Sequence, residues 1–242
     1  MRSLIRKYYS IKETQGIILS EKKSSIDAGL RALEKHRSEL EKYCEDNPIF
    51  KYSLSPLELV QAPLSAMRMS LAGMEADVGP MAAVAGVLAD LSVEAMLESG
   101  AQVAVVENGG EVSMSSKEPI SIAIAAGEAE LSREIGFRVE DFPLGIATSS
   151  GRHSHALSFG DSDAVTVFAE NAGLADAVAT SLGNMVMSNE EVNLQKVLSQ
   201  GLTIKGVQGL LILIDGKVGT CGKLPRLINL TDNKGERLQI TI

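Results

Sequence analysis

Apolar and polar positions along the chain alternate with two different periods, which separates predicted helices from predicted strands. The clearest helical stripe follows Ser24 or Ser25, either of which could cap the helix, and Asn47-Pro48 ends it. Its apolar members are Ile26, Leu30, Leu33, Leu40 and Cys44. The spacing predicts a helix of roughly 20 residues. Before it, residues 8–20 alternate loosely and predict a first strand.

The remainder of the chain mixes further strands with two more helices. Residues 51–63 are rich in turn-forming residues and predict a connector, after which a long helix runs from about Ala76 to Glu98. Pro80 suits its first turn, and the small residues that follow allow it to pack closely on a sheet. Strands are predicted at 101–106, 120–125 and 164–169, a hairpin at 209–216, and a helix at 173–185.

Hairpin signals join many of the predicted strands, and these decide the fold class. Asn108-Gly109 and Asp215-Gly216 are typical of tight turns between antiparallel strands. The pattern therefore predicts an α+β fold with layered antiparallel or mixed sheets and long helices, rather than a doubly wound parallel sheet. We expect one domain over residues 1–242. Residues 1–62 would supply the first strand, long helix and connector, and 63–242 the ligand-binding core.

Charge and cysteine content exclude several function classes. The net charge of −8, without a cluster of Lys or Arg, argues against a nucleic-acid partner and against binding to an anionic membrane. Cys44 and Cys221 are too far apart to form a metal-ligand motif or a disulfide framework. No apolar run near the start predicts a signal peptide, and no segment approaches a membrane span, so we expect a cytoplasmic protein.

One carboxylate stands out because it interrupts a run of small apolar residues. Asp176 lies in the predicted helix 173–185, with Thr180 four and Asn184 eight residues further on, so the three polar side chains share a helical face. A buried carboxylate is costly unless it is paired. Two explanations fit this spacing: Asp176 and Thr180 hold a hard cation such as Mg²⁺ together with substrate phosphates, or Thr180 simply hydrogen-bonds to Asp176.

Three segments in order resemble motifs of the ApbE family, the flavin transferases that move FMN from FAD onto a protein threonine. Asp77–Val84 stands where that family has Asp-Leu-Gly-Ala-Ile-Ala-Lys-Gly. Glu107–Glu111 is similar to its Asn-Ile-Gly-Gly-Asp turn. Ala147–Gly151, His155 and Asp176–Thr180 are similar to its Ala-Thr-Ser-Gly segment, following histidine and Asp-Ala-Leu-Ala-Thr helix.

The resemblance implies a ligand set. Asp176, Thr180 and the backbone carbonyl of Ala82 would ligate Mg²⁺, which polarises a phosphoryl oxygen. A cleft for FAD or FMN would be lined by Asn108, Gly109, Gly110, Ala147, Thr148, Ser149, Ser150 and Gly151. His155 would act as a proton shuttle, since an imidazole titrates near neutral pH. The implied partners are a small nucleotide ligand and a possible protein acceptor.

The chain also departs from the family pattern, which leaves the activity open. Ala83 replaces the lysine of the first motif, and Leu157–Asp161 replaces an Asp-Pro-x-Thr-Gly loop. With no export signal, the chain is similar to a divergent cytoplasmic branch. We expect FMN transfer or FAD cleavage, and the alternatives are a non-catalytic flavin-binding protein or a thiol-based role in sulfur metabolism through Cys221, predicted in a glycine-flanked turn beside Lys223. A zinc or iron site at His153 and His155 is a further alternative.

Overall fold

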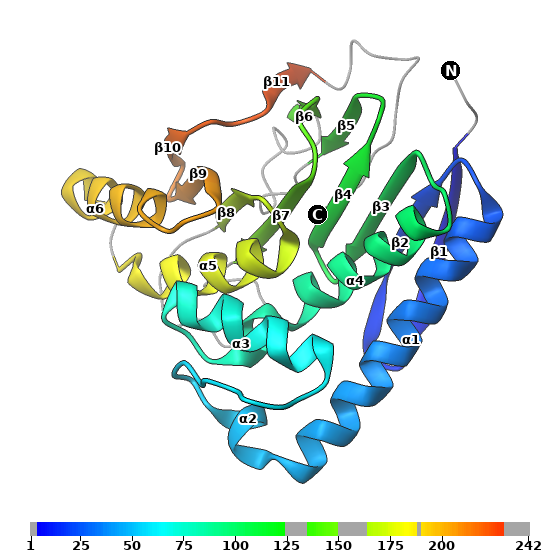
Figure 1. Ribbon diagram of the computed structural model, residues 1–242. Helices are drawn as coiled ribbons and strands as arrows, with labels where there is room; N and C mark the ends of the chain where they lie inside the picture. Colours follow the sequence, from blue (N-terminus) through cyan, green and yellow to red (C-terminus); the bar gives the residue numbers. More distant parts are fainter. Residues whose placement is uncertain (1–3, 124–134, 150–163, 188–189, 230–242) are drawn as a thin grey trace.

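An eight-stranded antiparallel sheet forms the middle layer of the molecule (Figure 1). The computed structural model describes residues 4–123, 135–149, 164–187 and 190–229. The strands follow the order β1-β2-β3-β4-β7-β8-β9-β10. Their bounds are β1 Ile5–Ile11, β2 Thr14–Ser20, β3 Val103–Asn108, β4 Glu111–Ser116, β7 Leu144–Ser149, β8 Ala164–Ala169, β9 Val207–Ile214 and β10 Lys217–Gly222.

The helices cover one face of this sheet, and a second, three-stranded sheet covers the other (Figure 1). The helices are α1 Lys23–Asp46, α2 Pro48–Tyr52, α3 Leu64–Ala76, the 3₁₀ turn η1 Pro80–Ala83, α4 Val84–Glu98, α5 Ala172–Met185 and α6 Glu191–Leu202. The small sheet contains β11 Arg226–Asn229, β6 Ile135–Val139 and β5 Ile120–Ala123 in that order.

Alternation along β3 shows how the two cores form. Val103 and Val105 point toward the small sheet and pack with residues such as Ile122 and Phe137. Ala104 and Val106 point the opposite way and pack with α1 and α4. Successive strand residues face opposite sides, so one apolar strand serves both cores. A separate large cluster joins α3, α4, α5 and α6 to β8 and β9.

The α+β class and the layered antiparallel sheets predicted above are confirmed, and so is β8 with its predicted bounds. The single strand predicted over residues 8–20 was wrong. The chain turns at Lys12, whose φ is 54°, and forms the hairpin β1–β2. The predicted caps of α1 were wrong too, because the helix begins at Lys23 and the hydroxyl of Ser25 is buried in a hydrogen bond with Ser99.

Two other local predictions need correction. A complete helix, α3, precedes the predicted start of the second long helix, and Asp77 ends it in the left-handed conformation with φ 55°. Cys221 lies within strand β10 opposite Leu210, not in a turn, and Lys223 pairs with Asp141 at 2.8 Å. Lys223 therefore has a carboxylate partner, and Cys221 lacks the glycine-flanked turn on which the sequence argument for an activated thiol rested.

One helical stretch of the described residues, Pro80–Glu98, is long and apolar enough to span a membrane by length and composition, contrary to the sequence expectation. Most of it is buried inside the protein. A helix surrounded by α1, α5 and the sheet is expected to be apolar on most sides, which accounts for its composition.

Candidate functional site

Helix α5 presents Asp176 on a different face from its apolar stripe. The side chain of Asn171 caps the helix by accepting a hydrogen bond from the N–H of Leu174 at 2.8 Å. Leu174, Val178 and Leu182 are buried in the main core, as the sequence predicted. Asp176 points elsewhere and is partly buried. The contacts of the Asp176 side chain are therefore made by neighbouring elements and not by the apolar residues of α5.

The Asp176 side chain forms a hydrogen bond with the backbone of the first turn of α4. Its carboxylate oxygen Oδ2 accepts a hydrogen bond from the N–H of Gly86 at 3.0 Å. N–H groups in the first turn of a helix have no partner within that helix and favour a negative group. Gly86 makes this approach possible, because a Cβ there would lie 2.2 Å from the backbone oxygen of Ala172. Close packing of α4 on α5 thus creates the Asp176 contact.

Asp176 lies in a negative environment. Burial raises its pKa to about 7, the N–H groups of Gly86 and Ala85 oppose this rise, and the charge of Asp90 adds to it. Burial also raises the pKa of Glu111 well above its usual range, and the nearby charge of Asp176 raises it further. Two carboxylates that disfavour each other's ionisation would both be stabilised by a bound cation. The donor chemistry therefore fits a divalent cation.

Thr180 and Ala82, the other predicted ligands, are both partly buried. Thr180 follows Asp176 by one turn of α5, and no hydrogen bond joins the two side chains within the described part of the chain. Ala82 belongs to η1, which packs on α5. No group of three or more His, Cys, Asp or Glu side chains arranged for a metal occurs among the described residues. A cation at Asp176 would need hydroxyl, carbonyl or phosphate oxygens as its other ligands.

The predicted glycine turn connects β3 and β4 at the end of the sheet that contacts the first turn of α4. Gly109 and Gly110 have φ values of 69° and 114°, a region that favours glycine. Glu107 stabilises the turn by accepting a hydrogen bond from the N–H of Gly110 at 2.8 Å. The side-chain amide of Asn108 donates to the carbonyl oxygen of Ala85 at 2.9 Å. Asn108 therefore uses its amide inside the protein. The N–H of Gly109 donates to the carbonyl oxygen of Gln15 at 3.0 Å, so the N–H groups of both glycines have partners within the fold.

The predicted segment 147–151 includes the last three residues of β7 and is described only in part. Val112 of β4 pairs with Ile146, so the register brings the glycine turn next to Ala147 and Thr148. Ala147 is buried in the main core, while Thr148 and Ser149 are partly buried at the strand end, where the Thr148 hydroxyl lies 3.0 Å from that of Thr166. Ser150, Gly151, His153 and His155 lie outside the described residues.

A family model described as "AbpE bacteria" matches residues 6–217. The chain belongs to this family. Among its relatives, a UPF0280 protein of Methanococcus maripaludis strain C5 is 38% identical over 230 residues, which cover 93% of each chain. A UPF0280 protein of Methanocaldococcus jannaschii is 34% identical over 235 residues, which cover 95% of each. This relationship supports the divergent ApbE-like branch that the sequence motifs predicted.

Solved structures support the same fold for this AbpE-family chain. The apo flavinyl transferase ApbE of Pseudomonas stutzeri has a TM-score of 0.58 at 14% identity, over 91% of this chain and 94% of that one. The ApbE protein of Thermotoga maritima also has a TM-score of 0.58 at 14% identity, over 97% and 100% of the two chains. At this identity the likeness concerns the fold alone.

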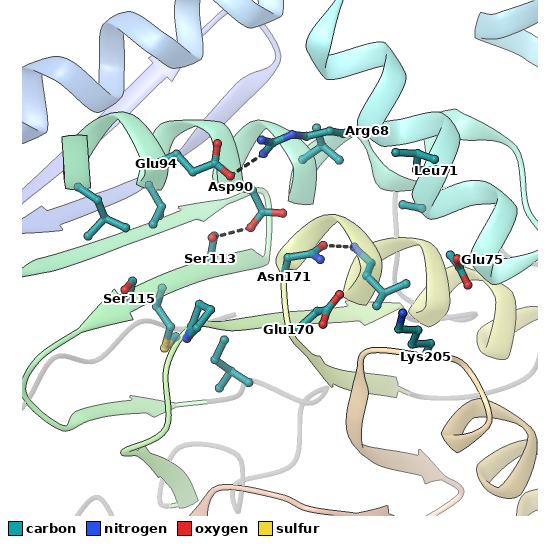
Figure 2. A pocket seen from close by; sticks show the side chains of 18 residues that line it. Arg68, Leu71, Glu75, Asp90, Glu94, Ser113, Ser115, Glu170, Asn171 and Lys205 are labelled. Carbon is teal, nitrogen blue, oxygen red and sulfur yellow. Dashed lines mark hydrogen bonds and ion pairs between the residues drawn. The ribbon is translucent and has the colours of Figure 1, made fainter. Parts of the chain in front are cut away.

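The structure also contains a cavity that the sequence did not predict (Figure 2). Its volume is about 650 Å³, and its lining includes Asn171 and Leu174 at the start of α5. Figure 2 shows Asp90 with its bond to Ser113, and the ion pair of Arg68 with Glu94 at 2.6 Å. None of the predicted site residues that the structure describes lines this cavity. The cavity therefore excludes the predicted ligands but shares Asp90 with the surroundings of Asp176.

Sequence reasoning missed the roles of Asp90, Glu107, Glu111 and Tyr9. Asp90 is 9% exposed and, like Asp176, interrupts an apolar helical run, so the same signal could have found it. Glu107 and Glu111 entered the sequence argument only as parts of a turn motif. Tyr9 gave no signal, because its importance depends on which strands pair with β1.

Proposed function

We propose that this protein binds a flavin nucleotide, FAD or FMN, together with Mg²⁺ at the junction of α4 and α5, and that it transfers FMN from FAD or cleaves FAD. The observation that carries the proposal is the position of the Asp176 carboxylate, which accepts from the Gly86 N–H at the first turn of α4 at 3.0 Å and lies near a second carboxylate, that of Glu111 on β4. Family membership and the ApbE-like fold support the choice of a flavin nucleotide.

In this proposal each element has a limited role. The Asp176 carboxylate, the Thr180 hydroxyl and the Ala82 carbonyl would hold the cation. Bound Mg²⁺ would supply Lewis-acid polarisation of a phosphoryl oxygen. The turn of Asn108, Gly109 and Gly110 would form one wall of the cleft, and the segment from Ala147 to Gly151 would line the cleft beside it. His155 would move a proton at the reacting phosphate.

A non-catalytic flavin-binding protein is the second candidate, and one position favours it. Ala83 stands where the ApbE motif has a lysine, and Ala83 is completely buried in the main core. A buried methyl group cannot supply the positive charge that a lysine would bring to a phosphate. The cleft would then retain the ligand while turnover is lost.

Incubation of the purified protein with FAD and Mg²⁺, followed by chromatography of FMN and AMP, separates these candidates. We expect product in the wild type, no product in Asp176→Asn, and unchanged product in the control Asp46→Asn, an exposed position at the end of α1. Stoichiometric flavin binding without product, also with acceptor proteins added, would favour the second candidate. If FAD gives no product and no thermal stabilisation, both candidates are contradicted.

A further inference from the structure

A chain of hydrogen bonds connects the edge strand β1 to Asp176. It begins at Tyr9, which is 9% exposed and belongs to the core cluster between the sheet, α1 and α4. The Tyr9 hydroxyl donates to the backbone oxygen of Glu107 at 2.9 Å and lies 3.4 Å from Oδ1 of Asn108. Because Oδ1 of Asn108 faces this donor, the Asn108 Nδ2 group is turned toward α4.

Strand register explains how Tyr9 reaches across a whole strand. Gly16 of β2 pairs with Tyr9 on one side and with Asn108 on the other. A Cβ at Gly16 would lie 2.0 Å from the Glu107 oxygen and 2.9 Å from the Tyr9 hydroxyl. The missing side chain therefore leaves the space through which the tyrosine hydroxyl contacts β3 (Figure 1 shows β1, β2 and β3 as neighbours).

The next two bonds share one peptide group. Asn108 donates to the carbonyl oxygen of Ala85 at 2.9 Å, and Asp176 accepts from the N–H of Gly86 at 3.0 Å. The Ala85 carbonyl and the Gly86 N–H belong to the same planar peptide unit. A donor to the carbonyl polarises that unit and strengthens its N–H as a donor on the opposite side. Asn108 thus acts on Asp176 through a rigid group of atoms.

We propose that Tyr9 is a positioning residue for Asp176: its hydroxyl orients Asn108, which fixes the Ala85–Gly86 peptide and thereby the carboxylate offered to the divalent cation. The role of the carboxylate rests on the proposed function, whereas the chain of contacts does not. Burial and the charge of Glu107 raise the pKa of Tyr9, so its hydroxyl keeps its proton as the donor.

The first measurement needs no ligand. In Tyr9→Phe the ring stays and only the hydroxyl is lost, so we expect the Gly86 amide to exchange with solvent faster relative to other amides of α4. A change of about fivefold corresponds to weakening one ordinary hydrogen bond. The controls are Tyr8→Phe, 69% exposed on the same strand, and Ile26→Val, which loosens the same core cluster without touching the chain of contacts. Neither control should alter Gly86 relative to its helix.

The second measurement links the chain to cation binding. Titration with Mg²⁺ at saturating FAD, followed by thermal unfolding, should show a several-fold weaker Mg²⁺ response in Tyr9→Phe than in Ile26→Val. A merely structural loss would shift both variants equally. Equal Gly86 exchange in Tyr9→Phe and the controls would overturn the inference. A wild type without any Mg²⁺ response would instead contradict the proposed function, and the Gly86 measurement would still decide whether Tyr9 maintains the chain.

Discussion

Two aspartates tie α4 and α5 together, and each contacts the beginning of the other helix. Asp90 of α4 accepts from the N–H groups of Ala172 and Gly173, at 3.0 and 2.8 Å, and from the Ser113 hydroxyl at 2.6 Å. Asp176 of α5 accepts from the N–H of Gly86 at 3.0 Å. The arrangement is nearly reciprocal, yet the two carboxylates have different numbers of donors and different neighbours.

The difference indicates different roles. Asp90 is 9% exposed. Its oxygens accept from the N–H groups at the start of α5 and from a strand hydroxyl, as expected of a structural group. Asp176 is more exposed, has fewer donors and lies beside Glu111, whose charge opposes its own. A carboxylate that the fold leaves incompletely compensated is a better candidate for a ligand than one that the fold fully uses.

The largest expected effect is on stability in Asp90→Ala. This change leaves two N–H groups of α5 and the Ser113 hydroxyl without their acceptor in a buried place, so we expect a loss of about 3 kcal/mol. Asp176→Ala should cost less than half as much, because its contacts with the first turn of α4 lie in a partly exposed place and a repulsive charge disappears. Urea unfolding of both variants measures this contrast, and equal losses would contradict the division of roles.

The next effect is a pH dependence caused by Asp176. Its pKa of about 7 in the folded protein exceeds the ordinary value, so between about pH 4 and 7 the folded state holds a proton that the unfolded state has released. Folding stability therefore falls as pH rises through this window. Asp176→Asn should unfold less readily than the wild type at pH 8, by on the order of 2 kcal/mol once solvent screening of this partly exposed group is allowed for, and show little difference at pH 4.

Unfolding curves at pH 4 and pH 8 without added ligand check this prediction. Asp90 and Glu111 also have raised pKa values and add to the overall slope, so the relevant quantity is the difference between Asp176→Asn and the wild type. A difference that is the same at both pH values would mean that the pKa of Asp176 is not raised in the folded protein. Saturating Mg²⁺ and FAD should remove the advantage of the variant at pH 8.

Sequence periodicity predicted α1, α5 and β8 because each has a regular apolar stripe or run. It missed α3, whose buried side includes small and polar residues such as Ser65, Ala72 and Gly73 and gives no contrast with the exposed side. It also merged β1 and β2, because the tight turn at Lys12 contains neither glycine nor proline. Elements with a clear contrast between apolar and polar faces can be predicted from the sequence, whereas elements that pack through small residues cannot.

The candidate site divides in a similar way. Asp176 could be found because a charge in an apolar helix is unusual by itself. Its contact with Gly86 and the link from Tyr9 through Asn108 join residues that are far apart in the chain. Such contacts depend on strand order and on the crossing of α4 and α5, which local patterns do not encode.

A smaller effect should follow loss of the strand hydroxyl that supports Asp90. Ser113 is 6% exposed, and Ser113→Ala removes one of three donors while the two N–H groups remain, so we expect a cost of about 1 kcal/mol. Ser115→Ala is the matched control, because Ser115 lies two residues away on β4 and lines the same cavity. A stability loss in the control as large as in Ser113→Ala would show that the Asp90 contact contributes little.

The smallest stability effect is expected at Thr180. Thr180→Val keeps the shape of the side chain and removes a partly buried hydroxyl that makes no hydrogen bond to Asp176 within the described residues, so stability without ligand should change by less than about 0.5 kcal/mol. If the hydroxyl is a cation ligand, apparent Mg²⁺ affinity at saturating FAD should nevertheless fall about tenfold, and Thr180→Ser should recover most of it. Thermal unfolding across a Mg²⁺ series measures both quantities in one experiment. An unchanged Mg²⁺ response in Thr180→Val would remove Thr180 from the proposed ligand set and leave Asp176 as its only side-chain ligand.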